Sequence, residues 1–174
     1  MLIKAASPEH FDKVMEFYYN LIDDMQDSKY HPGWEKDIYP TRQFIHDAIG
    51  HGELYTAIDD NAIVGAMVIN HDCAEEYTNV RWKINADRDQ VAVIHILGVS
   101  ARYQSRGIGK KMVAYAADIS KEKGIKAIRL EVLASNVPAL RLYASMGFLY
   151  MDTLQLFFED TGLTDFHIYE LTLE

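Results

Sequence analysis

Two glycines flanking one isoleucine, in the segment Gln104-Ser105-Arg106-Gly107-Ile108-Gly109, are the residues that most clearly suggest chemistry. They follow a β-branched run, Val91 to Val99, and precede apolar residues at helical spacing. Glycine lets the backbone approach a ligand closely, and the first N–H groups of a helix have no partners within the helix. The segment therefore predicts a backbone cradle for an anion such as pyrophosphate. Arg106, Lys110 and Lys111 would add positive charge at its rim.

Two common phosphate-binding motifs do not match this segment. The chain has no Gly-Lys-Ser/Thr of a nucleoside triphosphate loop, and the third glycine of the dinucleotide fingerprint is missing. What remains is Gln-x-x-Gly-x-Gly between a strand and a helix. Because a Gly-x-Gly also serves ordinary turns, the prediction depends on the motifs around it.

Further motifs occur in order around the cradle, namely Leu97-Gly98-Val99, Leu130-Glu131-Val132, Asn136, Ala139, Leu142-Tyr143 and Gly147-Phe148. From about residue 91 to 150, this series resembles the GNAT acetyltransferase superfamily. The resemblance implies acetyl-CoA as co-substrate and transfer of its acetyl group to an amine by direct attack in a ternary complex. The cofactor-binding residues that it implies are Leu97, Gly98, Val99, Gln104, Ser105, Arg106, Gly107, Ile108, Gly109, Lys110 and Asn136.

These residues divide by the part of the cofactor that the resemblance assigns to them. The backbone of Leu97 and Val99 would pair with the pantetheine arm as a strand would, and the amides of residues 104–109 would hold the pyrophosphate. Asn136 would contact the pantetheine or the thioester end. Asn136 also suits the N-cap of a helix that carries Pro138, and both roles can coexist.

Tyr143 is the predicted general acid, because it matches the tyrosine whose hydroxyl can face the thioester sulfur in some members of the superfamily. Two residues compete for the general base. Glu131 lies in a segment similar to the one that bears the base in ribosomal-protein alanine N-acetyltransferases. His95 shares a strand face with Leu97 and Val99 and matches the histidine of serotonin N-acetyltransferase. Either could instead be structural, His95 as a core residue and Glu131 as an outward-facing one.

The amine site is expected between the first two helices and the later strands. The first two helices and the loop between them contain Tyr18, Tyr19, Asp23, Asp24, Tyr30, Trp34, Glu35 and Tyr39. The segment from Phe157 to Phe166 is also expected to border the site. Carboxylates and aromatic faces suit a cationic acceptor, although an acidic helix surface over core aromatics explains them equally. We expect the primary amine of a small molecule. The alternatives are a protein N-terminus, as in the ribosomal-protein enzymes, or a CoA-binding module without catalysis.

Length and composition limit the number of domains and the classes of partner that the protein can have. The 174 residues predict a single domain over 1–174, and a net charge of −9 argues against nucleic acid as a partner. Without a long apolar run or a signal-peptide pattern, no membrane association is expected. One cysteine, Cys73, suits a reducing cytoplasm. No compact spacing of metal ligands occurs, so no metal is expected, and the sequence allows a homodimer as well as a monomer.

The elements that must position these residues follow from hydrophobic periodicity. Helices are predicted from Ser7 to about Gln26, from Thr41 to Ile49, from Ile108 to Lys123 and from Asn136 to Met146. Strands are predicted at 2–5, 54–58, 63–69, 91–99, 125–133, 148–158 and 166–173, and part of a strand at Val80 to Ile84. Strands interleaved with helices, ending in a long antiparallel pair, predict an α/β (α+β) fold. Its sheet is mixed and mostly antiparallel, with helices on both faces, as in the GNAT fold.

Overall fold

A computed structural model describes residues 1–173 and is built around one seven-stranded sheet. The strand order is β1-β2-β3-β4-β5-β7-β6. The strands are β1 (Leu2–Ala5), β2 (Leu54–Asp59), β3 (Ala62–Asn70), β4 (Val91–Val99), β5 (Ala127–Leu133), β6 (Leu149–Phe158) and β7 (Gly162–Thr172). Of the described neighbours, β4 and β5 alone pair in parallel. The predicted mixed, mostly antiparallel sheet is confirmed.

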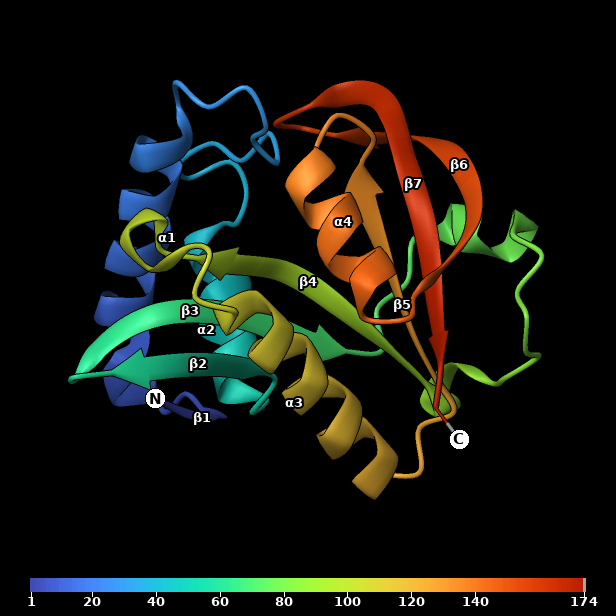
Figure 1. The fold of residues 1–174 in the computed structure, drawn as a ribbon, viewed down its shortest axis with the longest axis horizontal. Helices are drawn as coiled ribbons and strands as arrows, with labels where there is room; N and C mark the ends of the chain where they lie inside the picture. The colour runs from blue at the N-terminus through green and yellow to red at the C-terminus, as the bar shows by residue number, and fades with distance from the viewer. Residues whose placement is uncertain (174) are drawn as a thin grey trace.

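Among residues 1–173, four α-helices flank this sheet, two on each face. They are α1 (Phe11–Met25), α2 (Arg42–Gly50), α3 (Ile108–Glu122) and α4 (Val137–Ser145). A short 3₁₀ turn, Pro8–His10, precedes α1, and the hydroxyl of Thr41 caps α2 by accepting from the Phe44 N–H at 3.0 Å. In Figure 1, α3 and α4 lie on the near side of the sheet.

Each face of the sheet has its own hydrophobic core because strand side chains alternate between faces. On β5, Leu130 and Val132 point into the core that includes Met112 and Tyr143 of α3 and α4. The second core packs α1 and α2 against β2, β3 and β4. Its fully buried members include Val14, Tyr18, Ile45, Leu54 and Val68. The ligand-binding motifs therefore lie between two rigid layers.

Residues 71–90 cover the second face of the sheet over β5, β7 and β6, beyond the reach of α1 and α2 (Figure 1). Tyr77 and Val80 pack there against Phe166 and Ile168 of β7. The segment contains two 3₁₀ turns, Glu75–Asn79 and Arg88–Gln90. The strand predicted at Val80 to Ile84 is wrong. The amides of Lys83 and Ile84 donate to the Glu170 carboxylate, at 2.9 and 3.3 Å, instead of to a neighbouring strand.

A buried ion pair fastens this segment to the sheet. Nε of Arg129 on β5 lies 2.9 Å from Oε2 of Glu170 on β7, with side-chain exposures of 8% and 0%. The guanidinium stacks on the Trp82 ring at 3.8 Å and also donates to the carbonyl of Ile84. Because both charges are satisfied by several partners, the desolvation cost of burying them is offset locally. The pair therefore holds residues 77–84 against β5.

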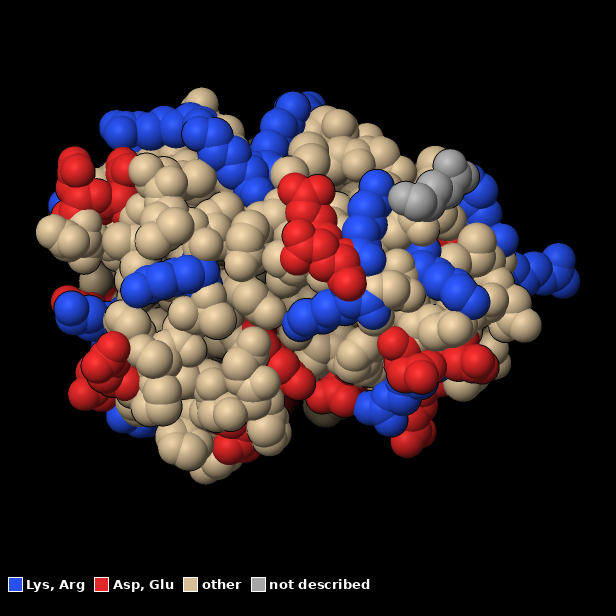
Figure 2. Space-filling view, turned by 90° about the horizontal axis from the view of Figure 1, so that it is seen from below, with Lys and Arg blue, Asp and Glu red and all other residues tan. Residues whose placement is uncertain are grey.

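The surface shows no strong separation of charge on the face drawn in Figure 2, where Lys and Arg side chains alternate with Asp and Glu. Cys73 is an exposed, free thiol. Within residues 1–173, no helix combines the length and the apolar character needed to cross a bilayer. In the same range, no three His, Cys, Asp or Glu side chains gather into a potential metal site.

Candidate functional site

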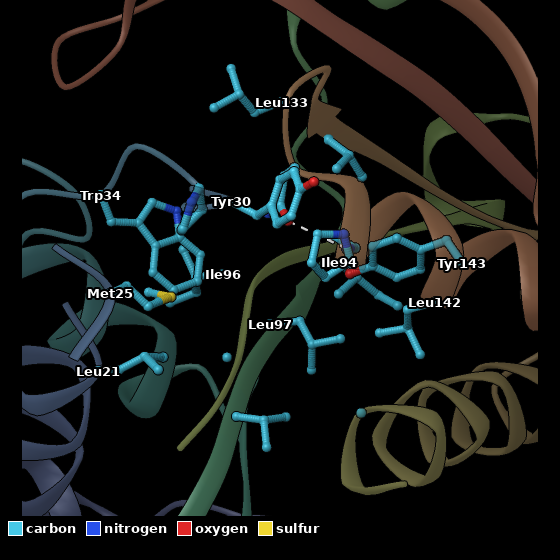
Figure 3. A pocket seen from close by; sticks show the side chains of 18 of the residues that line it. Leu21, Met25, Tyr30, Trp34, Ile94, Ile96, Leu97, Leu133, Leu142 and Tyr143 are labelled. Atoms are coloured by element: carbon cyan, nitrogen blue, oxygen red, sulfur yellow. Dashed lines mark hydrogen bonds between the residues drawn. The ribbon is translucent and has the colours of Figure 1, made fainter. Parts of the chain in front are cut away.

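A cavity of about 740 Å³ opens where β4 and β5 separate. The two strands pair only through Val91–Ala127, Ala92–Ile128 and Val93–Arg129, although β4 continues to residue 99 and β5 to residue 133. Parallel strands that diverge leave backbone groups and a gap between them. The cavity reaches both layers, so Trp34 and Met25 lie on one side of it and Tyr143 and Leu142 on the other (Figure 3).

A bulge shapes β4 at the centre of this gap. The pairing with β3 shifts register between Ala66 and Val68, and Ile96 adopts a left-handed backbone with φ of +46°. This conformation is unfavourable for a β-branched residue, so the surroundings must hold it. The buried Tyr18 hydroxyl donates to the Ile96 carbonyl at 2.9 Å. Beyond the bulge, the edge of β4 that faces the cavity pairs with no described strand.

The start of α3 forms the predicted anion cradle. Ser105 and Gly107 both have positive φ, 63° and 76°, which turns the chain into the helix. Within residues 1–173, the backbone N–H groups from Ser105 to Lys110 donate to no protein acceptor, and the series of paired amides begins at Lys111, which bonds Gly107 O at 3.0 Å. Six adjacent free donors at a helix N-terminus fit a diphosphate.

Glycine is needed at the two cradle positions, 107 and 109, for different physical reasons. A Cβ on Gly107 would meet no atom within 4 Å, so the space above it is open. A Cβ on Gly109 would lie 3.2 Å from Leu142 of α4, so this glycine permits close helix packing. Gly98 likewise lets β4 approach α1, because its Cβ would lie 2.4 Å from Leu21.

All but one of the predicted cofactor-binding residues line the cavity. These are Leu97, Gly98, Val99, Gln104, Ser105, Gly107, Ile108, Gly109, Lys110 and Asn136. Arg106 is not among the lining residues, and its guanidinium stacks 4.9 Å from the Tyr103 ring centroid. The side-chain oxygen of Asn136, Oδ1, caps α4 by accepting from the Ala139 N–H at 3.3 Å. The side-chain NH₂ group of Asn136 is left for the cavity.

Tyr143 lies on α4 at the cavity wall, 6% exposed, with its ring edge-on to Phe148. Its hydroxyl contacts no hydrogen-bond partner within residues 1–173, and no buried side-chain polar atom of that range is unsatisfied, so the hydroxyl must open to the cavity. Burial raises the pKa of Tyr143, and the nearby Glu131 carboxylate raises it further. The phenol is therefore protonated at neutral pH and can act as a donor.

His95 lies on β4 and lines the same cavity, but the bulge at Ile96 leaves it on the α2 side, edge-on to Phe44, so the predicted shared face with Leu97 and Val99 is wrong. Its Nε2 lies 2.9 Å from Oδ1 of Asn70, which also accepts from the Asp72 N–H at 3.0 Å. Because that backbone amide can only donate, the shared atom is the Asn70 oxygen and His95 Nε2 carries a proton. Nδ1 is then the lone-pair nitrogen. Burial lowers the pKa of His95 below its ordinary 6.5, against the opposing charges of Glu131 and Asp72, so the ring is neutral at physiological pH.

Glu131 lies on the β5 face opposite Leu130 and Val132, as its alternation predicts, and yet lines the cavity. The phenol of the buried Tyr77 donates to its Oε2. Burial raises the pKa of Tyr77, and the Glu131 charge adds to the effect, so the phenol keeps its proton and remains a donor. One carboxylate oxygen of Glu131 is therefore fixed by the 71–90 segment.

The expected acceptor residues are only partly brought together. Asp23 pairs with Lys36 at 2.6 Å on the surface, and Tyr19 donates to Asp37. Of the expected residues, Tyr30, Trp34 and Tyr39 from the α1–α2 loop line the cavity, as do Phe158, Asp160, Thr161 and Phe166 from the expected segment of the β6–β7 hairpin.

The two loops that carry these residues touch each other, as Figure 1 shows where the α1–α2 loop meets the hairpin tip. A Cβ on Gly33 would lie 2.2 Å from Cγ2 of Thr161. The two loops therefore meet beside this end of the cavity.

Two residues at the site were not predicted from the sequence. Asn70 orients His95, and Tyr77 holds Glu131, from positions 25 and 54 residues away in the chain. Tyr77 and Trp82 are aromatic residues in an otherwise polar segment, a signal that the segment packs against the sheet. Nothing in the sequence marks Asn70, because its role depends on strand register.

Comparison with known proteins gives one family match, to the acetyltransferase (GNAT) family over residues 16–148. N-alpha-acetyltransferase 30 of Saccharomyces cerevisiae is 30% identical over 113 residues, 62% of this chain and 58% of that protein. [Ribosomal protein bS18]-alanine N-acetyltransferase of Escherichia coli K12 is 35% identical over 57 residues, 33% of this chain and 38% of that protein. Mycothiol acetyltransferase of Renibacterium salmoninarum is 31% identical over 67 residues, 38% of this chain but only 20% of that protein.

Solved structures agree on the fold over nearly the whole chain. A GNAT-family acetyltransferase of Streptococcus agalactiae matches with a TM-score of 0.81 at 18% identity, covering 99% of this chain and 95% of its own. The Salmonella typhimurium protein yncA, solved with its cofactor acetyl-CoA, matches with a TM-score of 0.73 at 14% identity, covering 100% and 94%. The family match covers most of this chain, and the strand edge and the amide cradle of the cavity carry the motifs. This chain therefore belongs to the GNAT acetyltransferase family.

Proposed function

We propose that this protein transfers the acetyl group of acetyl-CoA to the primary amine of a small molecule, by direct attack in a ternary complex. The observation that carries the proposal is the run of free amides from Ser105 to Lys110, facing a cavity that also exposes the unpaired edge of β4. Membership of the GNAT family and the acetyl-CoA held by a protein of the same fold support it. We further propose that residues 1–174 act as one catalytic domain in the cytoplasm.

In this proposal the free amides and Lys110 bind the pyrophosphate, and the edge of β4 at Leu97, Gly98 and Val99 pairs with the pantetheine arm. The NH₂ group of Asn136 is free to contact the pantetheine or the thioester end. Arg106, stacked on Tyr103, adds positive charge at the rim. The bound thioester supplies an acetyl group whose carbonyl the amine attacks, and the residues supply position and proton transfer.

The proton transfers fall to side chains on opposite sides of the gap. Tyr143 donates its proton to the departing thiolate, because its hydroxyl is protonated and free of protein partners. His95 accepts the proton of the amine at Nδ1, since Nε2 is held by Asn70. Glu131 is the second candidate for the base, through the carboxylate oxygen that Tyr77 does not hold.

The contact between the two loops at the acceptor end favours a small molecule over a protein N-terminus. Gly33 and Thr161 are in contact, so the α1–α2 loop and the β6–β7 hairpin meet beside this end. A polypeptide acceptor needs an open groove along which several residues can lie. Acetylation of a protein N-terminus is the second candidate function, because the chain is similar to N-terminal acetyltransferases of yeast and Escherichia coli.

Release of free thiol from acetyl-CoA, measured against small amines and against short peptides, tests the proposal. We expect turnover with small primary amines and little with peptides. Turnover with peptides alone would assign the protein to N-terminal acetylation. Tight acetyl-CoA binding without turnover on any amine would overturn catalysis and indicate a CoA-binding module.

A further inference from the structure

The acceptor end of the cavity contains two carboxylates, Glu131 and Asp160, in different surroundings. Glu131 lies on β5, in the sheet, and is held by Tyr77. Asp160 lies in the turn between β6 and β7, beside Thr161, which contacts Gly33 of the opposite loop. Glu131 thus lies beside the side chains proposed to move protons, and Asp160 lies where the α1–α2 loop meets the β6–β7 hairpin.

Charge is distributed unequally along the cavity. Among its lining residues within 1–173, Lys110 is the only Lys or Arg, and it lies at the start of α3 with the free amides. The acceptor end therefore has two acidic groups and, among the described lining residues, no Lys or Arg to neutralise them. A positively charged ligand group would be attracted to this end, and a negatively charged one repelled.

Aromatic rings form the wall beside Asp160. The ring centroids of Tyr39 and Phe158 lie 6.4 Å apart, and those of Phe158 and Phe166 lie 5.1 Å apart. The Tyr39 hydroxyl has no hydrogen-bond partner within the described chain, and both Glu131 and Asp160 raise the pKa of Tyr39 beyond the effect of burial. Tyr39 therefore lies within the field of both carboxylates. Aromatic faces stabilise ammonium groups by cation–π attraction.

We propose that the acceptor is a small aliphatic amine that carries a second positive charge, and that Asp160, Tyr39 and Phe158 bind that charge. This inference rests on the proposed function. The amine that attacks must be neutral, so it cannot keep an ion pair with the protein while it reacts. The Asp160 carboxylate lies at the contact between the two loops, away from Tyr143 and His95. It can bind a second, distal ammonium group that stays charged throughout the reaction. The ligand class is that of diamines and longer polyamines.

The test compares three primary amines of equal chain length by thiol release: an alkyl monoamine, the matching diamine and the matching ω-amino acid. We expect kcat/KM for the diamine to exceed that for the monoamine by at least about tenfold, because a charged hydrogen bond in a partly buried site contributes that much. The ω-amino acid should be the poorest acceptor. Equal values for the three amines would overturn the inference and leave the acetyltransferase function standing.

Asp160→Asn should reduce the diamine-to-monoamine ratio at least about tenfold. Glu159→Gln is the matched control, since Glu159 is the exposed neighbour and does not line the cavity, and it should keep the wild-type ratio. A ratio that falls equally in both variants, or in neither, would contradict a role for Asp160. If Asp160→Asn fails to fold, the wild-type ratio of the three amines still decides.

Calorimetric titration of the diamine and the monoamine into protein saturated with CoA separates the two proposals. If no amine is acetylated but the diamine binds more tightly than the monoamine and loses this advantage in Asp160→Asn, the proposed catalysis fails and the cation site stands. If the diamine binds no better than the monoamine, the cation site fails whatever the turnover.

Discussion

The side chains proposed to move protons differ in how their polar atoms are already used. The Tyr143 hydroxyl is free and opens to the cavity, whereas His95 has one nitrogen bound to Asn70 and Glu131 has one oxygen bound to Tyr77. A free phenol with a raised pKa stays protonated at neutral pH, so its hydroxyl is available to donate to the departing thiolate. A neutral imidazole with one fixed nitrogen suits a base, because its tautomer is set in advance.

Tyr143→Phe tests the acid. Removing the hydroxyl should lower kcat by about 100-fold or more, because loss of a positioned proton donor typically costs that much. The KM for acetyl-CoA should change little, since the ring and its contact with Phe148 remain. Steady-state kinetics with acetyl-CoA varied at saturating amine measures both constants. Parallel losses in kcat and in acetyl-CoA affinity would mark Tyr143 as a packing or binding residue.

The pH dependence of kcat/KM tests the base. His95 must be neutral to accept a proton, so activity should fall as pH drops through its pKa, and burial places that pKa below 6.5. The acidic limb of the wild-type profile should therefore lie below pH 6.5, and His95→Ala should remove it along with most of the rate. If the limb survives in His95→Ala but disappears in Glu131→Gln, Glu131 is the base.

At the scale of elements, two local irregularities create the binding surface. The divergence of β4 from β5 opens the gap, and the sharp entry into α3 leaves six amides unpaired. Both depend on backbone that departs from regular geometry, at Ile96, Ser105 and Gly107. Strain of this kind persists only where surrounding packing holds it, and it collects at functional sites.

Gly107→Val should abolish acetyl-CoA binding while the protein still folds. The valine Cβ would enter open space above the cradle, where the diphosphate is proposed to lie. Gly124→Val, at the far end of α3, is the matched control, because Gly124 also has positive φ (75°) and open space around its Cβ. Both variants should lose about 1 to 2 kcal/mol of stability from the positive φ. Calorimetric titration with acetyl-CoA should detect binding in Gly124→Val only, and equal affinities would refute the cradle.

For the whole molecule, the sheet is continuous, and segments distant in sequence complete the cavity from both faces. The 71–90 segment is held by the Arg129–Glu170 pair and in turn holds Glu131 through Tyr77. Stability and the geometry of the site are therefore linked through one face of β5.

Arg129→Met should destabilise the fold by about 3 to 5 kcal/mol, because it leaves the Glu170 carboxylate buried without its charged partner. Lys36→Met removes the exposed pair with Asp23 and should cost no more than about 1 kcal/mol. Urea denaturation followed by circular dichroism gives both free energies of unfolding. Similar small losses in the two variants would show that the buried pair contributes little.

The sequence by itself determined those parts of the protein that are contiguous in the chain. The order of strands and helices, the Gly-x-Gly entry into α3, the Asn136 cap and the alternation that separates Glu131 from Leu130 and Val132 all follow from local patterns of period and turn chemistry. Local geometry fixes such features, since the interacting groups are a few residues apart. The strand predicted at Val80 to Ile84 failed because a distant carboxylate, Glu170, binds the amides there.

Only the tertiary structure decided which distant residues meet. Four features depend on strand register and packing between layers: the separation of β4 from β5, the bulge at Ile96, the orientation of His95 by Asn70 and the contact of Gly33 with Thr161. A one-residue change of register would turn these side chains to the other face, and no local pattern records the register. For the same reason, Asp23, which the sequence suggested for the acceptor, pairs with Lys36 on the surface, while Asp160 of the expected Phe157–Phe166 segment lines the cavity.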